Sequence, residues 1–172
     1  MLRSIQTRTR RRTSGAFAIV ASQYNASYVD AMLQAAKIEL KRAGAKVQII
    51  RVPGAFEIPV VAARLAASAH ASRITHPLRR RASAASHGSL SAIICFGVIF
   101  QGQTSHAQHI GWGVTHALAQ IQIQHLIPVI HAVFVFEKEE HARVRCLGKK
   151  HNRGTEAART ALAMAGVFEK ME

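Results

Sequence analysis

The sequence predicts a single α/β domain in which a four-stranded parallel sheet carries helices on both faces. Two observations support this. Short apolar runs rich in Val, Ile and Phe alternate along the chain with segments whose apolar residues recur at helical spacing. In addition, no apolar run approaches the roughly 18–20 residues needed to span a bilayer. At 172 residues, the chain is long enough to form one hydrophobic core.

The first half of the chain predicts two strands and two helices. The strands are expected at Ala16–Ala21, a short apolar run, and at Lys46–Val52, which Pro53 and Gly54 end. Helical spacing from Val29 to Leu40 predicts the first helix, which Gly44 should end. A second helix is expected at Ala55–Ala67.

Residues 68–90 lack sustained apolar periodicity, so they predict an exposed insertion, centred on about residues 70–90, within a domain of residues 15–172. The elements expected beyond it are a strand at Ser91–Gly97, a turn through Gly97 and Gly102, a helix at Thr104–His125, a strand at Pro128–Phe136, a helix at Glu137–Leu147 and a last helix from Asn152.

In a parallel sheet, ligands bind at the carboxyl ends of the strands. The loops expected there are Ser22–Asn25, Val52–Glu57, Gly97–His106 and the segment from Glu137 onward. The third loop enters a helix through Thr104, Ser105 and His106. Unpaired N–H groups at the start of a helix attract anions, and a histidine beside them can move protons near neutral pH.

Basic residues are concentrated in two segments of a chain whose net charge is +14. Residues 1–14 predict a flexible basic arm, and a second arginine cluster lies at 79–81. Three interpretations of the arm stay open: a solvated tail, an organellar transit segment, and an arm that binds polyanions. Cys95 and Cys146 have no metal-binding or disulfide spacing, which favours a reducing, cytoplasmic setting.

Several motifs together resemble one family. The motifs are the QYN loop, RVPGAFEIP, GVIFQGQTSHAQH, PVI and GKKHNRGTEAA, and they occur in the order found in 6,7-dimethyl-8-ribityllumazine synthases. The resemblance implies a flavodoxin-like three-layer sandwich. It also implies condensation of 5-amino-6-(D-ribitylamino)uracil with 3,4-dihydroxy-2-butanone 4-phosphate in riboflavin biosynthesis, with no metal or redox cofactor. It further implies sites between neighbours of a homopentamer, possible assembly into a sixty-subunit shell or paired pentamers, and association with riboflavin synthase.

The resemblance implies one catalytic residue, His106, as the proton carrier. It also implies a set of substrate-binding residues: Tyr24, Ala55, Phe56, Glu57, Ile99, Phe100, Gln103, Thr104, His131, Arg145 and Arg153. In this set Tyr24 stacks on the pyrimidine, the turn at 55–57 binds the ribityl chain, and Gln103 and Thr104 bind phosphate. Arg145 pairs with the phosphate and Arg153 lies near the pyrimidine carbonyl. His131 contacts the pyrimidine from the adjoining subunit.

Structural interpretations compete with several of these roles. Tyr24 could pack on the sheet edge, Glu57 could serve the helix dipole, and Ser105 with Gln108 could form a capping box. Arg145, Lys149 and Arg153 could form a solvated helix end. A metal site at His106 and His109 is disfavoured, since no carboxylate or cysteine completes it.

The chain departs from many family members at three positions. Gln101 stands where arginine is common, Gln108 where an acid is common, and His131 where phenylalanine is common. Two other functions therefore stay open: a non-catalytic shell or polyanion-binding protein, and a nucleotide binder. The second is disfavoured because Gly97–Gly102 lacks the GxGxxG spacing.

Overall fold

Four parallel strands form the central layer of the protein. The computed structural model describes residues 15–75, 90–148 and 151–171. The strands are β1 (Ala16–Ser22), β2 (Lys46–Val52), β3 (Leu90–Phe100) and β4 (Val129–Phe136), in the order β2-β1-β3-β4. The helices are α1 (Ala26–Arg42), α2 (Ile58–Thr75), α3 (His106–His125), α4 (Glu139–Ala142) and α5 (Arg153–Met171), and a π-helix spans Arg143–Leu147.

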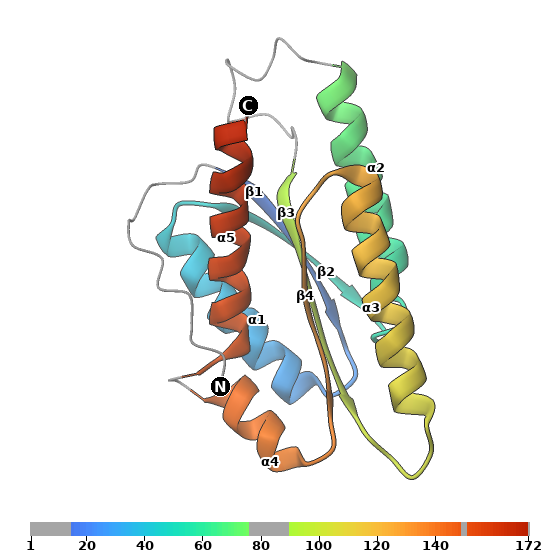
Figure 1. Cartoon of the computed structure of the whole chain (residues 1–172). Coiled ribbons are helices and arrows are strands. Elements are labelled where there is room, and N and C mark those ends of the chain that lie inside the picture. Colours follow the sequence, from blue (N-terminus) through green and yellow to red (C-terminus); the bar gives the residue numbers. More distant parts are fainter. Residues whose placement is uncertain (1–14, 76–89, 149–150, 172) are drawn as a thin grey trace.

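Helices cover both faces of the sheet, as predicted. Figure 1 shows α1 and α5 on one side and α2 and α3 on the other. Side chains of β1 alternate between the two layers: Phe17 and Ile19 belong to the core under α1 and α5, whereas Ala18 and Val20 belong to the core under α2 and α3. A strand buried on both faces needs apolar residues at every position, which explains the unbroken run.

The predicted turn at Gly97 is wrong. Gly97 lies inside β3, where it pairs with Val133, and the strand continues to Phe100. A Cβ added at Gly97 would lie 3.0 Å from Val133 Cγ1 and 3.4 Å from the Cβ of Ala55. The glycine therefore gives space to neighbouring side chains, and a side chain that approaches this closely is a known reason for glycine within a strand.

The second helix also differs from its predicted bounds. It begins at Ile58, after the turn at 55–57, and continues to Thr75. Ala69 is buried beyond the predicted end at Ala67, so a small residue carries the packing there. The first part of the predicted insertion is therefore helical, and its remainder, 76–89, lies outside the described residues, as does the arm at 1–14.

The segment after β4 contains a short α-helix and a π-helix in place of the single helix predicted at Glu137–Leu147. The last helix begins at Arg153, and Asn152 precedes it, with its Oδ1 accepting a hydrogen bond from Gly154 N at 2.8 Å. Within residues 15–75, 90–148 and 151–171, none of the helices has the length and apolar character that crossing a membrane requires.

Candidate active site

The loops that follow β1 and β2 are joined through their backbones. Gln23 N donates to Val52 O at 2.8 Å, and Tyr24 N donates to Pro53 O at 3.2 Å. These bonds continue the pairing of β1 with β2 past the last residues of both strands. The two loops are therefore held side by side, as their places at the carboxyl ends of parallel strands predicted.

Asn25 connects these loops to β3. Its backbone is left-handed, with φ of 55°, a conformation that asparagine tolerates better than most residues. This geometry accompanies a hydrogen bond from Asn25 Nδ2 to Val98 O at 2.8 Å. On the far side of β3, Gln101 N donates to Phe136 O at 2.9 Å, so the ends of all four strands form one connected edge.

Tyr24 and Glu57 both lie close to Gly54. A Cβ added there would lie 2.7 Å from Glu57 Oε2 and 3.5 Å from Tyr24 Cδ2, so any other residue would displace the carboxylate. Tyr24 is 72% exposed, although burial would be the rule for an aromatic that served only packing. The edge thus presents an open aromatic face next to an exposed carboxylate.

Phe56 and Ala55 connect this turn to α3 and to the sheet. Phe56 is 63% exposed, and its Cε2 lies 3.4 Å from the position of a Cβ at Gly113 on α3. Ala55 is buried against Gly97 of β3. Glycines at two distant positions in the chain therefore make room for one turn.

Three predicted site residues lie exposed at the start of α3: Gln103, Thr104 and His106. The predicted capping box is wrong, because Ser105 makes no side-chain cap hydrogen bond. Its Oγ instead lies 3.1 Å from His109 Nε2. The Thr104 hydroxyl oxygen accepts a long hydrogen bond, at 3.4 Å, from His106 N. The N–H groups at the start of α3 are thus not occupied by the Ser105 side chain that usually caps such a helix.

Gln101 holds the loop before α3 in shape. Its Nε2 donates to Thr104 O at 2.7 Å and to Gly102 O at 3.1 Å. The sequence identifies this position only as a departure from the usual arginine. The structure adds a local role, since the Gln101 amide bonds carbonyl groups one and three residues further along the chain.

Ile99 and Phe100 end β3 with their side chains on opposite faces. Ile99 packs toward α2 and α3, on the same side as the turn at 55–57. Phe100 packs in the other layer, with its ring centroid 5.5 Å from that of Tyr28 and 6.4 Å from that of Phe136. Of the two, Ile99 is therefore the one placed beside Ala55 and Phe56.

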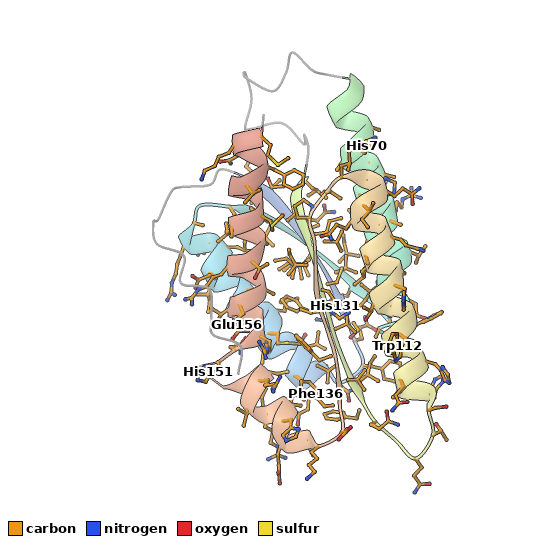
Figure 2. The ribbon with its side chains drawn as sticks, in the orientation of Figure 1. His70, Trp112, His131, Phe136, His151 and Glu156 are labelled. Carbon is orange, nitrogen blue, oxygen red and sulfur yellow. The ribbon has the colours of Figure 1, made fainter. Side chains whose placement is uncertain are left out.

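Within one chain, His131 lies far from the edge formed by the ends of the four strands. It pairs with Cys95 in the middle of β4, whereas Phe136 pairs with Phe100 at the strand end, and Figure 2 shows the two residues well separated. At about 3.3 Å per residue, the separation is roughly 16 Å. A single chain therefore does not bring His131 to Tyr24 or His106.

A hydrogen bond to α3 fixes the His131 ring. Thr115 Oγ1 donates its hydrogen to Gly111 O at 2.7 Å, so it must accept from His131 Nε2, 3.0 Å away. Nε2 therefore carries a hydrogen, and in the neutral ring Nδ1 is the acceptor. The His131 side chain stays partly exposed to solvent, and its partial desolvation against α3 lowers its pKa below the usual value near 6.5.

This shift predicts a pH-dependent contribution to stability. Because the folded pKa lies below the unfolded one, the contribution is complete above about pH 6.5 and is lost as the pH falls through the folded pKa. Between about pH 8 and pH 5.5, the melting temperature of the native protein should fall further than that of His131→Phe. Parallel melting curves for the two proteins would contradict the assignment.

Arg145 and Arg153 lie on elements of the α1 and α5 layer. Arg145 is exposed on the π-helix, whose Cys146 is buried in that core. Arg153 pairs with Glu156 and lies 6.0 Å from the centroid of the Phe134 ring. Lys149, the residue between them in the predicted basic trio, lies outside the described residues. Within one chain, these arginines therefore lie on the face of the sheet opposite the turn at 55–57.

Comparison with known proteins identifies the family. A family model described as 6,7-dimethyl-8-ribityllumazine synthase matches residues 14–169. The chain belongs to the 6,7-dimethyl-8-ribityllumazine synthase family. A protein of that name from Stenotrophomonas maltophilia (strain R551-3) is 34% identical over 161 residues, covering 92% of each chain. A second, from Xanthomonas euvesicatoria pv. vesicatoria (strain 85-10), is 33% identical over 162 residues, covering 92% of this chain and 93% of its own.

The family match covers the segments that form the edge. The match runs through every described element up to residue 169, so it includes the loops after all four strands. Among the described residues, no three His, Cys, Asp or Glu side chains gather into a metal site. The chemistry offered by the edge is that of an aromatic face, a carboxylate, an open helix N-terminus and an imidazole.

Proposed function

We propose that this protein condenses 5-amino-6-(D-ribitylamino)uracil with 3,4-dihydroxy-2-butanone 4-phosphate to form 6,7-dimethyl-8-ribityllumazine, phosphate and water. Family membership along residues 14–169 is the observation that carries the proposal. The edge described above supports it, because each of the two substrates meets a chemically suited half of the site.

The pyrimidine half consists of Tyr24 and the turn at 55–57. Tyr24 offers an open ring face on which a heterocycle can stack. Glu57 lies close to Gly54, as Tyr24 does, and can accept hydrogen bonds from the hydroxyls of a ribityl chain. Phe56 and Ile99 complete the apolar wall between the turn and β3.

The phosphate half is the start of α3. Backbone N–H groups there lie at the positive end of the helix dipole, and Ser105 does not cap them. Gln103 and Thr104 supply further donors beside them. Gln101 holds the Thr104 carbonyl, so the loop is shaped before a substrate binds.

Three residues of the proposed site require a second copy of the chain. His131 lies about 16 Å along β4 from the edge, and Arg145 and Arg153 lie on the layer opposite the 55–57 turn. A homopentamer in which each interface completes a site resolves this separation. Further assembly, into pentamer pairs or a sixty-subunit shell, and association with riboflavin synthase are extensions of the same proposal.

The reaction begins when the amine at carbon 5 of the uracil attacks the ketone, which loses water to give an imine. Loss of phosphate follows, and tautomerisation of the resulting enol leaves a carbonyl group. The ribitylamino nitrogen attacks this carbonyl, and loss of a second water closes the ring. His106 would carry protons between these steps, while the α3 N-terminus and Arg145 stabilise the departing phosphate. Holding two substrates in register can itself supply roughly 7–11 kcal/mol.

The test is to mix the purified full-length protein with both substrates. We expect the absorbance of the lumazine to rise together with release of one phosphate for each product molecule. Size-exclusion chromatography with light scattering gives the assembly in the same preparation. Absence of lumazine, together with binding of nucleic acid, would support instead a non-catalytic polyanion-binding member of the fold.

A further inference from the structure

A tyrosine, a glutamate and an arginine from three elements meet beside the end of the sheet. The Tyr28 hydroxyl, in the first turns of α1, donates a hydrogen bond to Glu139 Oε1 of α4. The same oxygen accepts from Arg143 Nη2 at 3.1 Å, at the start of the π-helix. We call these three residues the tyrosine latch. Proton transfer and substrate stacking, as proposed above, use none of them.

Tyr28 is buried, whereas Glu139 and Arg143 are exposed to solvent. Tyr28 is 7% exposed, and its ring lies edge-on to Phe100, the last residue of β3. The side chains of Glu139 and Arg143 are more than half exposed. Since exposed ion pairs contribute little by themselves, the anchoring of this pair must come from the buried tyrosine.

Charge in the latch is consistent with a neutral donor and an ionised acceptor. The hydrogen bond to Glu139 raises the pKa of Tyr28, and the hydrogen bond from Tyr28, followed by that from Arg143, lowers the pKa of Glu139. A hydrogen bond to an ionised carboxylate is stronger than one between neutral groups. The latch therefore holds across the neutral pH range.

The latch fixes the beginning of the π-helix, and Asn152 fixes its end. Arg143 is the first residue of that turn, and Asn152 Nδ2 donates to the carbonyl of Cys146 near its close. Cys146 is fully buried between these points. Arg145 lies between the two anchors on the exposed side of this turn. Isolated π-helical turns often occur at functional sites, where they redirect side chains.

We propose that the tyrosine latch positions Arg145 for the phosphate of the second substrate, and that Tyr28 and Glu139 thereby control affinity for phosphate. This inference rests on the proposed function for the role of Arg145. Tyr28 and Glu139 are positioning residues in it, because they act through the π-helix and touch neither substrate.

The test compares substrate affinities in Tyr28→Phe, which keeps the ring against Phe100 and removes only the hydroxyl. We expect the KM for the butanone phosphate to rise about threefold to tenfold, the range expected when part of one charge-assisted hydrogen bond is lost. The KM for the uracil substrate should stay within about twofold. Titration calorimetry with inorganic phosphate should show the same weakening. Glu139→Ala, a change at an exposed position, should reproduce the result if Tyr28→Phe folds poorly.

A matched control is Asp30→Asn, which breaks an exposed ion pair to Arg51 from the same helix α1. It should alter neither KM nor phosphate binding. In an Arg145→Ala background, Tyr28→Phe should have no further effect, because both changes act on the same contact.

Two results would overturn the latch: an equal rise of both KM values, or an undiminished effect of Tyr28→Phe when Arg145 is already absent. Failure of the native protein to form lumazine would instead count against the proposed function. The calorimetric titration would then still decide the inference: phosphate affinity unaffected by Tyr28→Phe and by Glu139→Ala rejects it.

Discussion

Replacing His106 with alanine is expected to lower kcat by about 10²- to 10⁴-fold, the usual contribution of a positioned general acid or base. His106 is the first residue of α3 and is exposed, so its loss leaves no cavity in either core. The KM for the uracil substrate should change little, because Tyr24 and the turn at 55–57 stay intact. Steady-state rates of lumazine formation give kcat and KM, and a thermal melt shows whether the fold is retained.

His109→Ala provides the matched control for position. His109 is exposed one turn later on the same helix, and its Nε2 contacts Ser105 Oγ. It should retain turnover close to that of the native protein. If His106→Ala is as active as the native protein, or if His109→Ala loses as much activity, proton transfer at this position is not the function of His106.

β1 was predictable because it is buried on both faces, and such a strand needs uninterrupted apolar residues; it is only one residue longer than predicted. β2 agrees with Lys46–Val52 at both ends although most of its residues are exposed or half-buried, because Pro53 and Gly54 mark where it ends. Gly97 misled the prediction for a physical reason. A glycine after an apolar run indicates a turn in isolation, whereas here it admits Ala55 from a segment far away in the chain. Only the tertiary contact distinguishes the two cases.

The location of the site was predictable from the sequence, but the hydrogen bonds that hold its loops in place were not. Topology places the carboxyl ends of parallel strands together, so the grouping of Tyr24, Glu57 and His106 along one edge follows from the order of elements. The supporting contacts join positions far apart in sequence, such as Asn25 with Val98 and Tyr28 with Glu139. No local pattern marks such pairs, because hydrogen-bonding side chains are common on exposed loops and helix ends.

Gly154→Ala is expected to destabilise the fold by about 1–3 kcal/mol or more, the cost of overfilling a packed contact. Gly154 is buried at the start of α5, where this helix packs on α1. A Cβ there would overlap the carbonyl oxygen of Met32, which belongs to helical backbone and cannot rotate away as a side chain can. The helices would have to separate, and the movement would carry Asn152 and Arg153 with them. Loss of stability should therefore be accompanied by weaker substrate binding.

The same helix supplies the control that isolates this contact. Gly166 lies further along α5, and a Cβ added there would meet no atom within 4 Å. Gly166→Ala should be neutral or stabilise by roughly 0.5–1 kcal/mol, since alanine favours helix over glycine. Both variants carry the same Gly→Ala change, so we expect their urea unfolding midpoints to shift in opposite directions. Equal midpoints would mean that α1 and α5 are not in backbone contact at Gly154, and the placement of Arg153 beside Phe134 would lose its support.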